Sequence, residues 1–223
     1  MAETAAHKAF QLTIRRPKAL LQMFDAGTLK PKQGDKRSVG KPSWQENELL
    51  RASVITAIGA LDAYLSDVAA EVLVAQLENA DTPGSDARTV LKQVMDEIKT
   101  LPLELALVTD AAKRREVAQA AIQDHLANRV SNHGAKGVAT TLGRMGETID
   151  WSKLDKSVTP ALKIKGMKHN PAALLDAWTQ RRHKLVHQGK ALKVGSPEAH
   201  ALVDFVVAIA AAVDDVAVGA EKK

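Results

Sequence analysis

Apolar side chains recur at three- and four-residue steps along most of the chain, which is the spacing of one face of an α-helix. The clearest case begins at Ser43-Trp44-Gln45-Glu46, where Ser43 and Glu46 have the spacing of a capping box at a helix start. The stripe then runs to about Leu77 through positions with helical spacing: Leu50, Val54, Ile58, Leu61, Leu65, Val68 and Val72. At about 1.5 Å per residue this helix would be roughly 50 Å long, so we expect it to be the spine of the fold.

The same pattern predicts further helices over residues 10–26, 86–99, 103–130, 138–145, 171–188 and 196–216. Gly27 and Gly189 follow two of them as C-caps, and Asn170-Pro171 and Ser196-Pro197 each give an N-cap followed by Pro at the first helical position. Residues 146–170 show no regular pattern. Because no strand alternation stands out, we expect an all-α, up-and-down bundle of about five to seven helices, closed by an αα-hairpin.

Composition supports this fold class. Hydrophobic residues make up 45% of the 223 residues but aromatic residues only 3%, so the core is expected to consist of Leu, Val, Ile and Ala, which suits helices. The length allows one large domain or one domain with an extension. Residues 30–37 are polar and contain Pro and Gly, which indicates a loop. We therefore expect residues 1–42 to form a helix and basic loop extension and residues 43–223 to form the bundle.

Several classes of function are disfavoured. The chain has no cysteine, which excludes disulfides, thiol nucleophiles and thiolate zinc sites. It also lacks a Walker or Gly-x-Gly-x-x-Gly pattern, so we expect no cofactor. The longest apolar run, residues 205–213, is shorter than the ~20 residues that a membrane span needs, and the first residues lack a signal-peptide pattern. We expect a cytoplasmic protein without a membrane partner.

The net charge of +5 and the pI near 9.4 are compatible with RNA as a partner. Much of the excess positive charge lies in residues 30–41 and at Lys222-Lys223, where a solvated charged segment explains it equally well.

The run from Arg181 to His187 is the best candidate for chemistry, because it gathers Arg181, Arg182, His183, Lys184 and His187 near the end of one helix. Cations near a helix C-terminus can also have a purely structural role, since they complement the helix dipole. Two reaction classes fit the residue types. His183 and His187 have the i, i+4 spacing of zinc ligands, but the Glu that follows the first His in a metalloprotease is missing. Alternatively, Arg could hold a phosphate while His transfers a proton during phosphodiester cleavage.

Helical geometry constrains the hypothesis that Arg182 and His187 cleave a phosphodiester. If Leu174, Trp178 and Leu185 face the core, Arg182 lies at the edge of that stripe and His187 is displaced from Arg182 by about 140°. Either the helix loosens before Gly189, or a second chain supplies the missing partner of each residue. Proton-transfer cleavage needs both a base and an acid, and two chains would supply two histidines. This favours a homodimer.

Two segments resemble a known family. Arg182-x-x-x-x-His187, with the polar His183 directly after the Arg, resembles the Arg-x4–6-His signature of the HEPN superfamily. Arg51-Ala52-Ser53-Val54 and Gly59-Ala60-Leu61-Asp62-Ala63-Tyr64-Leu65 are similar to a helix of the RiboL-PSP type of HEPN domain. The resemblance covers about residues 44–218, with specific motifs only at its two ends.

The resemblance implies a metal-independent endoribonuclease of phage defence or toxin–antitoxin systems, which cleaves RNA by 2′-hydroxyl attack in a composite site of a homodimer. Arg182 would bind the phosphate, His187 would be the acid–base residue and His183 would assist. Four further residues could support the site or contact RNA: Asp62, where Glu is more frequent in the family, Arg51, Arg181 and Lys190. An antitoxin or defence-system protein would be a further partner.

The alternative is a HEPN-like helical module that binds protein or RNA without cleaving it. Many HEPN-like bundles are not catalytic, and this chain has few aromatic side chains for stacking on bases.

Overall fold

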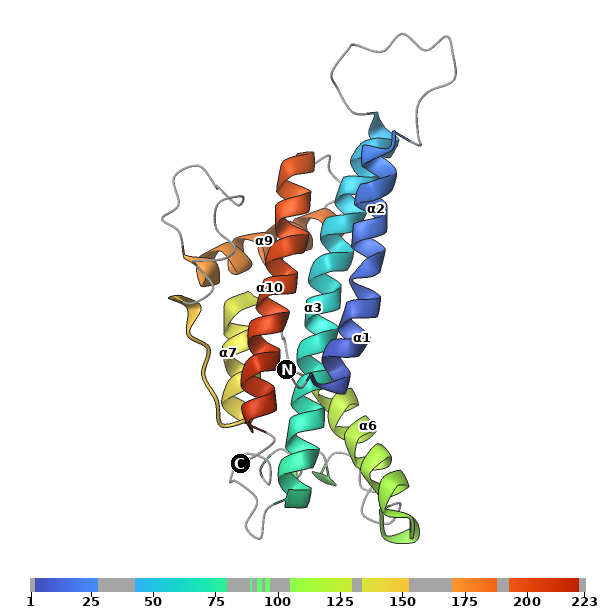
Figure 1. The fold of residues 1–223 in the computed structure, drawn as a ribbon, viewed down its shortest axis with the longest axis vertical. Helices are drawn as coiled ribbons and strands as arrows, with labels where there is room; N and C mark the ends of the chain where they lie inside the picture. Colours follow the sequence, from blue (N-terminus) through green and yellow to red (C-terminus); the bar gives the residue numbers. More distant parts are fainter. Residues whose placement is uncertain are drawn as a thin grey trace. The chain divides into compact units, whose positions relative to one another are not determined.

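The computed structural model describes residues 3–27, 43–79, 89, 92–93, 95–96, 105–129, 134–152, 170–187 and 193–220. Over these ranges the chain forms seven helices and no strand, so the predicted all-α class is confirmed (Figure 1). The helices are α1 (Ala5–Thr13), α2 (Arg15–Asp25), α3 (Trp44–Asn79), α6 (Ala111–Arg129), α7 (Gly134–Arg144), α9 (Pro171–His187) and α10 (Ser196–Ala220). The segment predicted as a helix over residues 86–99 lies largely outside the described ranges, as do most of residues 146–170.

The capping box at the start of α3 is formed as predicted. The Ser43 hydroxyl accepts from the Glu46 N–H at 3.1 Å, and the Glu46 carboxylate accepts from the Ser43 N–H at 2.6 Å. The helix continues for 36 residues, and all seven residues of its predicted apolar stripe are at most 2% exposed. Periodicity and a local cap therefore define this helix.

The N-terminal helix differs from the prediction in its start and its continuity. It begins at Ala5 rather than Phe10, and it breaks at Ile14 into α1 and α2. Pro17 explains the break, because it has no N–H to donate to the carbonyl of Thr13, and its ring would clash with that carbonyl in a continuous helix. The predicted end is confirmed: Gly27 has a φ of 60°, and its N–H donates to the Phe24 carbonyl at 3.0 Å.

The segment predicted as one helix over residues 103–130 is helical at residues 105–107 and again in α6, with a break at residues 108–110. Asp110 caps α6, since its carboxylate accepts from the Lys113 N–H at 2.9 Å and its carbonyl from the Arg114 N–H at 3.0 Å. The short helix predicted from residue 138 is α7, which begins earlier, at Gly134.

The chain divides into two compact units, each of which is discontinuous in sequence. The first comprises residues 1–9, 62–150 and 210–223, and the second comprises residues 10–61 and 151–209. The predicted boundary at residue 42 stays a prediction, since residues 28–42 lie outside the described ranges.

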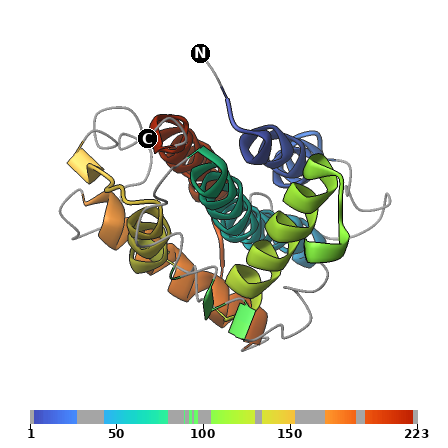
Figure 2. The same cartoon turned by 90° about the horizontal axis from the view of Figure 1, so that it is seen from below.

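In the first unit, α6 and α7 flank the C-terminal half of α3 (Figure 2). The contact between α3 and α6 is made by small and branched side chains, which allow the two helices to approach closely. The buried members of this cluster are Ala69, Ala70, Leu73, Val74, Ile122 and Leu126.

A polar network, part of it buried, holds the N-terminus of α1 in the same unit. Both carboxylate oxygens of Glu71 on α3 accept backbone N–H groups, from Ala5 at 2.9 Å and from Ala6 at 2.8 Å. The Thr4 hydroxyl accepts the His7 N–H at 3.0 Å. These bonds satisfy N–H groups that have no partner within the first turn of a helix.

Asp214 on α10 completes this network. It accepts from the backbone N–H and the hydroxyl of Thr4, and its Oδ2 lies 3.1 Å from Nδ1 of His7. His7 is only 8% exposed, so its imidazole is buried against this carboxylate. Nearby, burial raises the pKa of Tyr64, so its hydroxyl stays protonated and donates to the carbonyl of Ala210 at 3.2 Å.

Replacing Glu71 by Ala tests the role of this network. We expect Glu71→Ala to lower the free energy of unfolding by about 1.5–3 kcal/mol, because two helix N–H groups lose a charged acceptor. Glu116→Ala, which changes an exposed Glu of α6, is the matched control. The comparison is made by urea unfolding. Equal stability of the two variants would show that Glu71 does not hold α1 in place.

Candidate functional site

The candidate site lies on α9, whose start and buried face are as predicted. The Asn170 carboxamide oxygen accepts from the N–H groups of Ala172 at 3.0 Å and Ala173 at 3.3 Å. The side chains of Leu174, Trp178 and Leu185, which share one face of the helix, are buried. This stripe fixes the rotation of α9 about its own axis, and therefore the direction of every other side chain on it.

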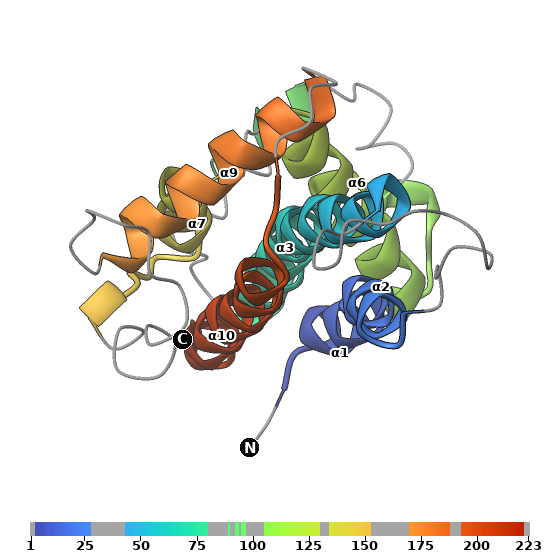
Figure 3. The ribbon, with the colours of Figure 1, turned by 90° about the horizontal axis from the view of Figure 1, so that it is seen from above.

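In the second unit, α9 has a direction different from that of its neighbours. Seen from above, it lies lengthwise, whereas α2 and the starts of α3 and α10 are seen nearly end-on (Figure 3). The αα-hairpin predicted for the last two helices would place them side by side, but α9 runs across α10 instead.

Arg181 connects the end of α9 to the start of α10. Its guanidinium lies 4.7 Å from the centre of the Trp178 ring, and it donates to the carbonyl of Lys193 and to the carboxylate of Glu198, the latter at 3.2 Å. The same carboxylate oxygen accepts from the N–H of Gly195 at 3.2 Å, at the beginning of α10. Arg181, predicted to support the site or to contact RNA, is therefore engaged in contacts within the chain.

His183 and His187 are brought together by the structure. Both side chains are exposed, and their ring centroids lie 4.4 Å apart with an angle of 48° between the ring planes. The i, i+4 spacing of a regular helix produces this contact. The last two turns of α9 thus present two adjacent imidazoles to solvent.

Arg182 and His187 point in different directions. Arg182 is half-buried at the edge of the apolar stripe, whereas His187 is exposed. The helix stays regular through His187. Up to that residue it therefore does not loosen in the way that would bring His187 toward Arg182. At about 100° per residue, the two side chains remain roughly 140° apart around the axis. One chain does not place them around a single phosphate.

The other predicted site residues occupy varied positions. Arg51 on α3 pairs with Glu48, with 2.7 Å between Nη1 and Oε1, and its Nε is buried without a hydrogen bond to any residue in the described ranges. Asp62 is half-buried on α3 and belongs to the first unit, whereas Arg51 and the residues of α9 belong to the second. Lys190 lies outside the described residues.

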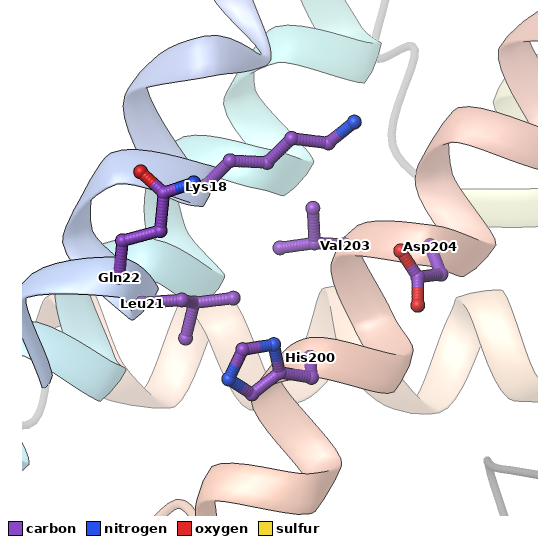
Figure 4. Close-up of a pocket in the computed structure, with 6 residues that line it drawn as sticks. All are labelled: Lys18, Leu21, Gln22, His200, Val203 and Asp204. Carbon is purple, nitrogen blue, oxygen red and sulfur yellow. The ribbon is translucent and has the colours of Figure 1, made fainter. Parts of the chain in front are cut away.

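A small pocket that sequence reasoning missed lies between α2 and α10 (Figure 4). Its volume is about 170 Å³, and it combines apolar side chains with both signs of charge. The lining residues are Lys18, Leu21, Gln22, His200, Val203 and Asp204. None of the residues predicted for catalysis lines it. At its edge, Nε2 of His200 lies 3.0 Å from Oδ2 of Asp25.

Neither a closed metal site nor a membrane span is found in the part of the chain that the structure describes. No group of three or more His, Asp or Glu side chains there is arranged to hold a metal ion. Within the same ranges, no helix combines the length and the apolar character needed to cross a bilayer.

Comparison with models of protein families, with curated proteins and with solved structures finds no match. The geometry of α9 and the resemblance of its sequence motif are therefore the features that point to a function.

Arg181→Ala tests the connection between α9 and α10. We expect it to lower the free energy of unfolding by about 1–2 kcal/mol, because a cation–π contact and a partly exposed ion pair are lost together. Lys184→Ala on the exposed face of the same helix is the control, with an expected change within ~0.5 kcal/mol. Chemical denaturation measures both. If the two variants were equally stable, the Arg181 contacts would not contribute to the fold.

Proposed function

We propose that the chain is a metal-independent endoribonuclease of the HEPN type, acting in phage defence or a toxin–antitoxin system. The observation that carries the proposal is the C-terminal end of α9. Its last two turns expose two adjacent imidazoles, those of His183 and His187, directly after the half-buried Arg182 in the same Arg-x4-His run. These are the groups that cleavage of a phosphodiester by proton transfer needs.

Each residue has a distinct role in this proposal. Arg182 holds two phosphate oxygens through its planar guanidinium, and its partial burial strengthens that interaction because the local dielectric is lower than in water. A base removes the proton of the 2′-hydroxyl, the 2′-oxygen attacks phosphorus, and the bond from phosphorus to the 5′-oxygen breaks. An acid protonates the departing 5′-oxygen. His187 performs proton transfer, and His183 orients or assists it.

We propose that two chains form the site. Arg182 and His187 point about 140° apart on a regular helix, so a phosphate held by one arginine is not within reach of the histidine of the same chain. A twofold dimer that pairs the ends of two α9 helices would supply the missing group from the partner. It would also supply the second histidine that acid–base catalysis requires.

A second candidate function is a helical module that binds a protein without cleaving RNA. It is favoured by two observations. Arg51 and Arg181 form ion pairs within the chain, which leaves fewer cations for a phosphate backbone. Trp44 at the start of α3 is 73% exposed, and large exposed aromatic side chains are frequent in protein interfaces. RNA cleavage by the purified chain distinguishes the two candidates.

The ribonuclease proposal predicts the behaviour of two single variants. His187→Ala should lower the cleavage rate by roughly 10²–10⁴, because it removes the proton-transfer group, and Arg182→Ala should cost about as much by removing transition-state charge stabilisation. Products of the parent chain should carry a 2′,3′-cyclic phosphate and a 5′-hydroxyl, and cleavage should persist in EDTA. His200→Ala, which changes a histidine of α10, is the matched control and should cleave normally.

Both α9 variants should remain folded, with stability changes within ~1 kcal/mol, because neither residue belongs to the apolar stripe. Folded variants that cleave as fast as the parent would exclude the proposed roles. Variants that unfold would show that the two residues are structural. Cleavage that disappears in EDTA and returns with zinc or magnesium would contradict the metal-independent mechanism.

A further inference from the structure

The paired histidines on α9 suit a second kind of chemistry. His183 and His187 lie one helical turn apart, are both exposed, and have ring centroids 4.4 Å apart. Imidazole nitrogens bind late first-row divalent ions at about 2.0–2.1 Å, so two rings on adjacent turns of one face can share an ion. The helix holds the two ligands close together before any ion arrives.

The helix dipole favours a cation at the pair, whereas the charge of Lys184 opposes one. The pair lies in the last turns of α9, where the helix dipole and the final carbonyl groups give a partial negative charge. Lys184, between the two histidines in sequence, opposes a cation. Its ammonium is exposed on a flexible side chain, so solvent screens its charge and it can turn away.

The surroundings of the pair differ from those of His7 and His200. His7 is buried against Asp214, and His200 pairs with Asp25, so each of these already faces a carboxylate. Only two protein ligands are available at α9, because no larger group of metal-binding side chains occurs in the described part of the chain. Water would fill the remaining coordination positions, which is the arrangement of an open and exchangeable site.

We propose that His183 and His187 together bind one late first-row divalent transition-metal ion, of the type of zinc or copper. This site is independent of RNA cleavage and needs only one chain. A consequence does rest on the proposed function: a metal-bound imidazole has no lone pair for a proton, so occupancy of the site would switch the ribonuclease off. The ion would then be an inhibitor, which agrees with cleavage that persists in EDTA.

Zinc titration of the full chain without a polyhistidine tag tests the binding site. Isothermal calorimetry should show one zinc ion bound per chain at this site. His183→Ala and His187→Ala should each weaken binding by at least tenfold, since loss of a mere supporting residue already costs a metal site roughly 10–100-fold. Lys184→Ala and His200→Ala, which leave the pair intact, should bind zinc as tightly as the parent or more tightly.

The binding proposal is overturned if zinc does not bind, or if the parent and the two single-histidine variants bind it equally. Because calorimetry needs no activity, zinc binding by a chain that cleaves no RNA would support the metal site while contradicting the ribonuclease. If the chain cleaves RNA, saturating zinc should stop the parent. At the same zinc concentration, zinc should slow His183→Ala, relative to the zinc-free rate of that variant, at least tenfold less than it slows the parent. Unchanged cleavage by zinc-saturated parent chain would overturn the inhibitory consequence.

Discussion

The burial of one face of α9 is the constraint on which the functional argument depends. Leu174, Trp178 and Leu185 are buried, and each is worth roughly 1.5–3 kcal/mol relative to an exposed side chain. Rotating the helix far enough to bring His187 to the position of Arg182 would expose this face and cost several kcal/mol. The contacts of Arg181 with Trp178, Lys193 and Glu198 oppose such a rotation as well.

The fixed orientation of α9 about its own axis makes the charged side chains of residues 181–187 point in three directions. Arg181 turns toward the start of α10 and stabilises the fold, Arg182 lies half-buried at the edge of the apolar stripe, and the two histidines face solvent. A sequence that reads as one cluster of cations is therefore distributed around the helix. This arrangement supports the proposed dimer, because another copy of α9 would add an imidazole from a different direction without unwinding the helix.

Features that depend on neighbouring residues could be predicted from the sequence. The Ser43–Glu46 capping box, the apolar stripe of α3 and the Asn170 cap are all encoded within one or two helical turns, and the structure contains each of them. The pairing of His183 and His187 is of the same kind. The break at Ile14 also has a local cause in Pro17, but the apolar pattern continues through the break and conceals it.

Long-range contacts could not be predicted in this way. The bonds between Thr4 and Asp214 join residues 210 positions apart, and the contact between His200 and Asp25 joins residues 175 positions apart. No periodicity indicates which buried face of one helix will meet which carboxylate of another. For the same reason the sequence could not assign Arg181 to Glu198, which depends on the path of the chain after α9.

Mixing two inactive variants tests the central claim, that Arg182 and His187 act together across two chains. Arg182→Ala retains His187, His187→Ala retains Arg182, and both retain His183, so a mixed dimer contains one complete Arg182–His187 pair and a second histidine for proton transfer. We expect subunit exchange between the two variants to restore cleavage well above the sum of their separate rates. A mixture of Arg182→Ala with the double variant should stay inactive. Mixed dimers that form but do not cleave, or a monomer that cleaves at the full rate, would contradict the account.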